Sequence, residues 1–209
     1  MKLIPVLELE PATYSKIQRK IPDYGDIKGW SSYWAESLSD SGMFDIKPVK
    51  AGSWFVELSQ ISDENLNIIL NKELGDFDET DDEISPMLGG YALKVDKSII
   101  ILPSCCGDLS NIDDWQDASE YIGEAEKELW IGHPWLLVKG DKDTVEIVQT
   151  SEYEEPHDPE RITVKRSELK DAIRFAKIEL NQFESRLLLL IETRYGSKAK
   201  SICSQLVCR

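Results

Sequence analysis

The sequence predicts an α+β protein: a single domain over residues 1–209, with a mainly antiparallel or mixed sheet packed by helices and a long C-terminal helix. Short alternating or β-branched runs typical of strands recur along residues 3–102. A hairpin pattern follows at 134–150, and apolar residues at helical spacing extend over 167–195. With 209 residues, of which 41% are hydrophobic, the chain can bury a core of ordinary size.

The N-terminal part predicts short elements. In chain order they are a strand at 3–9, a helix at 29–38 with its aromatic residues on one side, a strand at 52–59 and a loop at 75–83. Residues 66–74 fit two structures. Their alternation favours a strand, whereas Asp63 and Glu64 suit the first turn of a helix and Gly75 suits its end.

The middle of the chain carries sharper patterns. Residues 91–95 alternate, Asp96 and Lys97 form a turn, and 98–102 is apolar enough to predict a central strand that ends at Pro103. A loop at 104–112 then leads into a predicted helix at 113–130. The apolar residues of that helix recur at steps of three and four, and a capping-box pattern precedes them: Trp115, Ala118, Ile122, Ala125 and Leu129, after Ser110 and Asp113.

The C-terminal part predicts a hairpin at 134–150, an irregular link at 151–161 and a closing helix at 167–195, with Ser167 as N-cap and Gly196 as C-cap. The apolar stripe of this helix consists of Leu169, Ile173, Ala176, Leu180, Phe183, Leu187 and Leu190. At about 1.5 Å per residue the helix would be ~42 Å long. Such a length suggests packing on a neighbouring helix or, alternatively, a homodimer through this helix.

Charge is divided unevenly along the chain. Residues 1–160 carry 34 Asp and Glu against 13 Lys and Arg, whereas residues 161–209 carry 5 against 11, so the net charges are −21 and +6. We therefore expect an acidic body that repels nucleic acid and attracts cationic proteins, and a basic helical segment at 161–209 that docks onto this body. The sequence shows no secretory signal pattern and no apolar run near the ~20 residues that span a bilayer, which favours a cytoplasmic protein without a membrane partner.

Two groups of carboxylates are the candidate partner-binding residues. They are Asp76, Asp78, Asp81, Asp82 and Glu83 in the predicted loop, and Asp113, Asp114 and Asp117 at the start of the predicted helix. The loop fails the EF-hand pattern because Asp81 and Met87 stand where a glycine and a glutamate belong. We therefore expect a solvated acidic loop, open to a cationic partner, and we predict no metal site and no cofactor.

Cys105 and Cys106 follow a predicted strand, a place where α/β proteins often carry reactive groups. Cys106 is the candidate reactive thiol, with His133 or His157 as the available base. A local signature of a thiol enzyme is missing and cysteines are usually buried, so a structural role for the pair is the favoured interpretation and no catalytic residue is assigned. The four cysteines also lack the C-x-x-C pair typical of zinc sites.

The loop at 105–109 has a specific predicted geometry. Asp108 is expected to accept backbone N–H bonds, Gly107 to adopt a positive φ, and Leu109 to be buried. The surrounding segment also carries a resemblance. Pro103, the run C-C-G-D-L at 105–109 and Trp115 on the next helix are similar to a group of mostly uncharacterised bacterial proteins.

The order of elements resembles the layout of SMI1/KNR4-like proteins, which combine an aromatic N-terminal helix, a set of strands and a long closing helix. Many of them are immunity proteins of bacterial toxin systems. The resemblance implies a non-enzymatic intracellular binding protein, most concretely an immunity protein that neutralises a cationic toxin domain through its acidic face. The alternative is a small thiol-dependent or hydrolase-like enzyme centred on Cys106. The absence of a catalytic triad pattern favours the binding protein.

Overall fold

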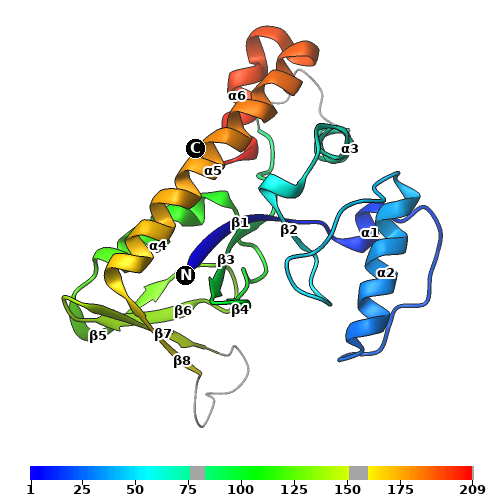
Figure 1. The fold of residues 1–209 in the computed structure, drawn as a ribbon. Helices are drawn as coiled ribbons and strands as arrows, with labels where there is room; N and C mark the ends of the chain where they lie inside the picture. Colours follow the sequence, from blue (N-terminus) through cyan, green and yellow to red (C-terminus); the bar gives the residue numbers. More distant parts are fainter. Residues whose placement is uncertain (76–82, 151–159, 209) are drawn as a thin grey trace. The chain divides into compact units, whose positions relative to one another are not determined.

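The structure is a computed structural model that describes residues 1–75, 83–150 and 160–208 (Figure 1). The described strands are β1 (Lys2–Glu8), β2 (Phe55–Glu57), β3 (Gly89–Val95), β4 (Ser98–Ile101), β5 (Gly123–Leu129), β6 (Leu136–Gly140), β7 (Thr144–Gln149) and β8 (Arg161–Lys165). The described α-helices are α1 (Pro11–Tyr14), α2 (Ile27–Asp40), α3 (Asp63–Glu73), α4 (Ile112–Glu120), α5 (Arg166–Tyr195) and α6 (Ala199–Leu206). Two four-stranded sheets, ordered β2-β1-β3-β4 and β5-β6-β7-β8, and the long helix α5 confirm the predicted α+β class.

The chain divides into two compact units. Unit 1 consists of Met1–Pro5 and Leu88–Asn181, and unit 2 consists of Val6–Met87 and Gln182–Arg209. Two of the three boundaries fall inside β1 and inside α5, so each of these two elements contributes residues to both units, and the third falls between Met87 and Leu88, just before β3. The two units are described separately below.

The sheet of unit 1 that positions the site is antiparallel throughout, from β5 to β8. The predicted hairpin is confirmed as β6 and β7, which pair in register from Leu136 with Gln149 to Gly140 with Val145. Strand β8 was not predicted. It is short and flanked by charged residues, and it is defined by its pairing with β7 rather than by a strong pattern of its own.

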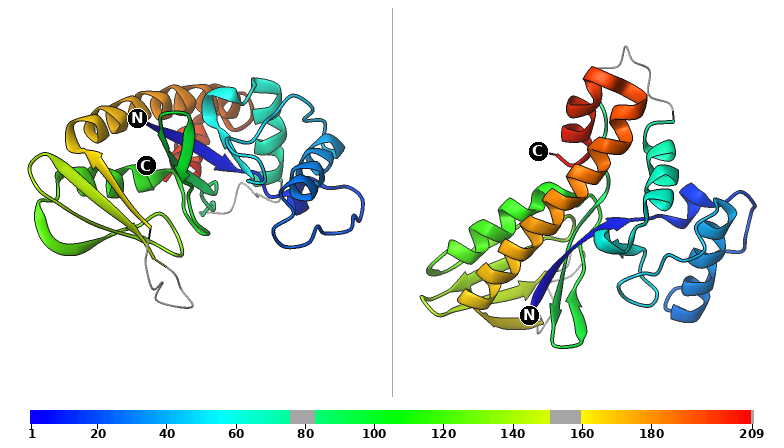
Figure 2. Two further views of the ribbon diagram at one scale, coloured as in Figure 1. Left: turned by 60° about the horizontal axis from the view of Figure 1, so that its bottom comes forward. Right: turned by 45° about the horizontal axis from the view of Figure 1, so that its top comes forward.

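Two helices cover one face of this sheet: α4 and the first part of α5 lie side by side over it (Figures 1 and 2). Trp115 on α4 and Leu169 on α5 are fully buried. Arg166, the first residue of α5, is also buried, and its guanidinium donates hydrogen bonds to the backbone carbonyls of Ser119, Tyr121, Asp141 and Thr144. These bonds fasten the end of α4 and the turn of the β6–β7 hairpin to the start of α5.

The helix predicted at 113–130 is wrong beyond Glu120. α4 ends there, Tyr121 is extended, and residues 123–129 form β5. Ile122 and Ala125 are exposed, so the helical spacing that included them does not face a core. Pairing with β6 outweighs the helix propensity of the Glu, Ala and Lys residues in this segment.

β3 and β4 confirm the two strands and the turn predicted at 91–102. β4 lies at the end of its strand order, so the prediction of a central strand is wrong. Its isoleucines Ile99 and Ile100 are only half-buried. An apolar β-branched run therefore identified a strand here without identifying the position of that strand in the sheet.

Unit 2 resolves the ambiguous segment 66–74 as part of helix α3. Ser62 caps this helix by accepting a hydrogen bond from the backbone N–H of Asn65 at 3.2 Å. The helix predicted at 29–38 is confirmed as α2, and its buried Trp34 donates an indole hydrogen bond to the carbonyl of Leu9 at 2.9 Å. β2 is shorter than the strand predicted at 52–59, since it begins only at Phe55 and residues 58–60 form a 3-10 turn.

Helix α5 confirms the predicted closing helix, but it begins at Arg166, so Ser167 lies inside the helix and is not its N-cap. The first six residues of the predicted stripe are buried, while Leu190 is half-exposed and Ile191 is buried in its place. α6 was not predicted, and it follows Gly196, whose φ is +50°. Because the stripe is already buried in a single chain, a second copy is not required to cover it.

Two residues of the basic segment form ion pairs with acidic residues, one in each unit. In unit 1, Nζ of Lys177 lies 3.6 Å from Asp113, and in unit 2 Arg186 lies 2.7 Å from Asp63. By sequence, unit 1 holds 20 Asp and Glu against 12 Lys and Arg, and unit 2 holds 19 against 12, for net charges of −8 and −7. Although charge is distributed unevenly along the sequence, the two units therefore carry almost the same net negative charge.

Within the part of the chain that the structure describes, no helix combines the length and the apolar character needed to cross a membrane.

Candidate functional site

A strongly acidic stretch of unit 1 is built by α4 and β5, which follow each other in the chain. Residues 113–128 contain a single basic residue, Lys127. They also contain seven carboxylates, which we call the acidic edge: Asp113, Asp114, Asp117, Glu120, Glu124, Glu126 and Glu128. All of these except Asp114 are exposed. β5 is the first strand in the order of its sheet, so three of the carboxylates lie on an edge strand.

The three predicted carboxylates of the acidic edge differ in their surroundings. Asp113 and Asp117 are exposed and each approaches one lysine, Lys177 at 3.6 Å and Lys127 at 3.4 Å. Exposed pairs of this kind contribute roughly 0–1 kcal/mol, so both carboxylates remain accessible to a partner. Asp114 is half-buried. Its burial raises the pKa of its carboxyl group, and the neighbouring Asp117 and Asp113 raise it further.

The three glutamates of β5 were missed because this segment was predicted to be helical. Between the pairs Gly123 with Gly140 and Lys127 with Val138, β5 has three residues and β6 has one. The resulting bulge holds Glu124 and Glu126 on the exposed edge. The strict alternation of glutamates after Gly123 is the sequence signal that would have located this strand.

The second predicted group of carboxylates belongs to the other unit. Glu83 is exposed in unit 2. The predictions for Asp76, Asp78, Asp81 and Asp82 lie outside the described residues. The structure therefore brings together Asp113, Asp114 and Asp117 with newly recognised neighbours on β5.

The cysteine loop precedes α4, and backbone hydrogen bonds hold it from two sides. The bonds are Gly107 N to Ser104 O at 3.2 Å, Gly89 N to Gly107 O at 2.9 Å, Ser104 N to Ile131 O at 2.9 Å and His133 N to Cys105 O at 2.9 Å. Residues from three separate segments of unit 1 thus fix the backbone on both sides of Cys106.

Asp108 and Leu109 behave as predicted. Oδ1 of Asp108 accepts the backbone N–H of Ser110 at 2.7 Å, and Leu109 is fully buried. The backbone N–H of Asp108 in turn donates to the side chain of Asn111 at 3.0 Å, which completes a capping box. This box replaces the one predicted from Ser110 and Asp113, and it leads the chain into α4.

Gly107 is required for a different reason than predicted. The positive φ of the loop belongs to Cys106, at +67°. A Cβ on Gly107 would instead lie 2.7 Å from the carbonyl oxygen of Ile131 and 2.9 Å from that of Gly89. The glycine is therefore needed to allow a close backbone approach.

Both thiols of the pair are exposed, which contradicts the expectation that they are buried. The Sγ atoms of Cys105 and Cys106 lie 3.1 Å apart. Cys203, in unit 2, is buried, and burial raises the pKa of its thiol to about 11. Among the described residues, no group of three or more His, Cys, Asp and Glu side chains is arranged to hold a metal ion.

An aromatic cluster stands beside the cysteine loop. The imidazole of His133 packs edge-on against Trp130, with ring centroids 4.7 Å apart, and against Trp135 at 5.7 Å. The two indoles stack on each other at 6.4 Å. The backbone of His133 pairs with Cys105, so this cluster is coupled to the loop; His157, the other candidate base, lies outside the described residues.

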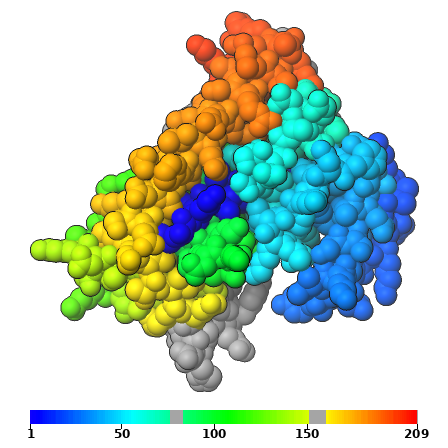
Figure 3. Space-filling model, viewed as in Figure 1, coloured from blue at the N-terminus to red at the C-terminus, as the bar shows by residue number. Residues whose placement is uncertain are grey.

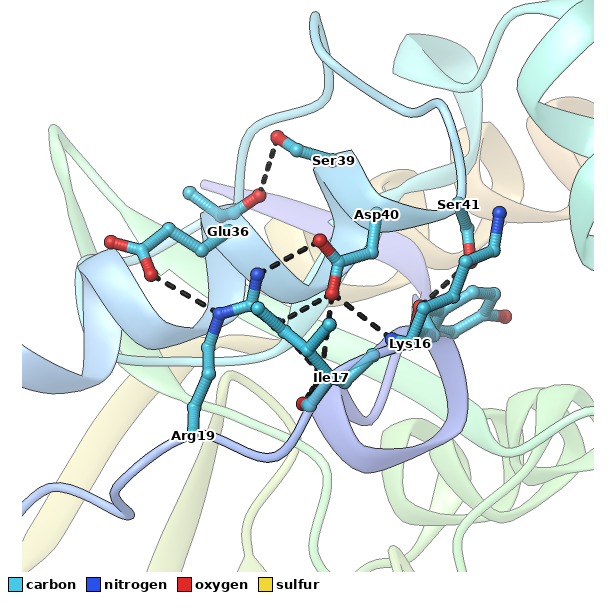
Figure 4. A network of polar contacts seen from close by, with 10 residues as sticks. Lys16, Ile17, Arg19, Glu36, Ser39, Asp40 and Ser41 are labelled. Carbon is cyan, nitrogen blue, oxygen red and sulfur yellow. Dashed lines mark hydrogen bonds and ion pairs between the residues drawn. The ribbon is translucent and has the colours of Figure 1, made fainter.

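Unit 2 has a groove that the sequence analysis did not predict. Arg19 makes a bidentate pair with Asp40, at 2.5 and 2.8 Å, and its Nε lies 3.2 Å from Glu36 (Figure 4). This pair pins the segment that precedes α2 against that helix, and the surface of both is blue in Figure 3. The cavity between them measures about 420 Å³, and its lining mixes both charges with Tyr33 and Ile21. The ion pair has a structural role, and the mixed lining selects no single ligand class.

Comparisons with protein-family models, with curated proteins and with solved structures found no match.

Proposed function

We propose that this protein is a non-enzymatic binding protein that captures a cationic protein partner with the acidic edge of unit 1. The observation that carries the proposal is the gathering of six exposed carboxylates on one helix and the edge strand that follows it. A surface of one charge attracts a complementary surface and accelerates encounter with it.

The positions of these carboxylates support a role in binding. Asp113 and Asp114 lie in the first turn of α4, where their negative charge interacts favourably with the helix dipole and stabilises the helix. Asp117 and Glu120 lie in its last turn, where negative charge is unfavourable. Charged edge strands also resist aggregation, which accounts for the glutamates of β5. Resistance to aggregation does not account for Asp117 and Glu120, because they lie on a helix and not on an edge strand.

The partner class that fits best is a basic toxin domain, such as a nuclease with a cationic cleft. On this proposal the protein is a cytoplasmic immunity protein that covers the cleft. The resemblance of the order of elements to the layout of SMI1/KNR4-like proteins motivates this choice of role. No nucleic acid partner is expected, because both units are acidic.

The proposal is tested by capturing partners from the source cell with the wild-type protein and with a Glu124→Gln, Glu126→Gln, Glu128→Gln variant. The matched control replaces Glu10, Glu64 and Glu192 by Gln, which changes the net charge equally at exposed positions outside the acidic edge. We expect a basic protein to be retained by the wild type and the control but lost by the variant. Equal retention by all three proteins, or recovery of no basic protein, would count against the proposal.

A second candidate function is thiol chemistry at Cys106, which the exposure of this residue favours. A thiol-dependent enzyme requires a cysteine that reacts as thiolate near or below neutral pH. Alkylation of the folded protein by iodoacetamide measures this directly. Rapid labelling of Cys106 below neutral pH supports the hypothesis of a thiol-dependent enzyme. Labelling as slow as that of free cysteine under the same conditions argues against it.

A further inference from the structure

Two adjacent exposed thiols are in contact in the loop that precedes α4. Cys105 and Cys106 approach to 3.1 Å between Sγ atoms. A covalent S–S bond measures about 2.05 Å, so an approach of roughly 1 Å would join them. Both side chains are exposed, so a small oxidant can reach them.

We propose that Cys105 and Cys106 form a modification site, which a two-electron oxidant of the peroxide class converts reversibly into a disulfide between the neighbouring residues. This inference is independent of the proposed partner binding. It assigns the pair a redox role in which the peroxide is the only other reactant.

The chemistry uses both thiols and the peroxide. The thiolate of one cysteine attacks a peroxide oxygen, the O–O bond breaks, and a sulfenic acid forms while the other oxygen leaves as water after taking a proton. The second thiolate then attacks the sulfenic sulfur, the S–S bond forms, and the hydroxyl group leaves as water. The two sulfurs together lose two electrons, and hydrogen peroxide is reduced to two molecules of water.

The covalent geometry makes such a bond readily reversible. Adjacent Cα atoms lie about 3.8 Å apart across a trans peptide, below the roughly 4.4–6.8 Å usual for disulfides. A disulfide between neighbours is therefore strained, and strained disulfides are the more easily reduced ones. A thiol reductant can return the site to its starting state.

The backbone of the loop keeps the two thiols together. Cys106 has a φ of +67°, which is uncommon for a residue with a side chain. Hydrogen bonds from Gly107 to Ser104 and from His133 to Cys105 hold this conformation on either side. Strained conformations that persist in this way are concentrated at functional sites.

The other cysteines provide an internal comparison. Cys203 is buried and burial raises its pKa, so its thiolate is less available to an oxidant. Cys208 is exposed in unit 2. Oxidation is therefore expected to select the pair over Cys203, and a Cys208→Ser variant separates the pair from the remaining exposed thiol.

The test treats the reduced full-length protein with hydrogen peroxide and measures its intact mass and the peptide that contains residues 105 and 106. We expect loss of two hydrogen atoms within this peptide, restored by dithiothreitol, in the wild type and in Cys208→Ser. Cys105→Ser and Cys106→Ser should lose this change completely, and each should instead gain oxygen or a mixed disulfide. Thermal melting of each variant verifies that it is folded.

Fluorescence gives a second readout, because Trp130 and Trp135 pack against His133, whose backbone pairs with Cys105. We expect a reversible change in tryptophan emission that both single cysteine variants abolish. The proposal is overturned if the wild-type peptide only gains oxygen atoms, if its mass is unchanged, or if the two-hydrogen loss persists in Cys106→Ser.

Discussion

Gly107 illustrates how one missing side chain fixes the loop beside the acidic edge. The carbonyl oxygens of Ile131 and Gly89 occupy the space that a Cβ would need. Close backbone approach at this point lets the cysteine loop bond to two other segments of unit 1. The residue acts through sterics, and the unusual dihedral angle belongs to the cysteine before it.

A Gly107→Val substitution should therefore destabilise the protein by ~1 to 3 kcal/mol through overpacking against backbone. The control is Gly196→Ala, at a position of positive φ with open space around it, which should cost only about 1 kcal/mol. Urea denaturation of both variants checks the difference. A Gly107→Val protein as stable as the wild type would mean that the loop is not held as described.

Asp40 supplies a prediction about pH. Hydrogen bonds from Arg19, and then from the backbone of Lys16, hold the pKa of this carboxyl group well below its ordinary value. Because the folded state binds this proton more weakly than the unfolded state, the stabilisation is complete above pH ~4. It is lost as the pH falls from there through the lowered pKa of the folded state.

The free energy of unfolding of the wild type should therefore fall more steeply below pH 4 than that of Asp40→Asn. Chemical denaturation at a series of acidic pH values measures both slopes. Asp96→Asn is the control, because Asp96 is exposed in a turn and forms no ion pair within the described part of the chain. Identical slopes for the wild type and Asp40→Asn would show that the ion pair with Arg19 does not lower the pKa of Asp40 in the folded state.

At the scale of elements, α5 was predicted correctly, whereas β5 was predicted as the end of a helix. The stripe of α5 repeats over several turns, so single deviations such as Leu190 do not obscure it. Residues 122–129 also fit a helical spacing, and this short segment is rich in helix-forming residues, so its sequence was read as a helix. The alternating glutamates favour a strand, but the helical spacing of the apolar residues competes with them, and pairing with β6, a later part of the chain, stabilises the strand. The glutamates of the candidate site were missed for this reason.

The buried stripe of α5 predicts a contrast between two leucines on one helix. Leu180 is fully buried and Leu189 is 65% exposed. Leu180→Ala should reduce the free energy of unfolding by ~2 to 5 kcal/mol. Leu189→Ala should change it by no more than about 0.5 kcal/mol. Similar effects of both changes, together with a halved mass in solution for Leu180→Ala, would identify the stripe as a dimer seam instead.

At the scale of the whole molecule, the residue patterns predicted the fold class and the composition predicted the acidic character, but neither predicted how charge is distributed in the folded protein. The sequence separates a basic segment from an acidic body, while folding divides α5 between two units of nearly equal charge. The distribution of charge along the sequence could not reveal that α5 belongs to both units, because the position of a helix depends on packing. The exposure of Cys105 and Cys106 was likewise set by the surrounding backbone bonds and not by their residue type.

The most direct test of the acidic edge is the rate at which the captured basic partner associates with the wild type, with the β5 triple glutamine variant and with the matched control. At low ionic strength we expect association with the variant to be at least about 10-fold slower, because long-range attraction is weakened. Added salt should slow the wild type more than the variant, while all three proteins keep their melting temperatures. An association rate that is the same for all three proteins and independent of salt would contradict the proposed role of the acidic edge.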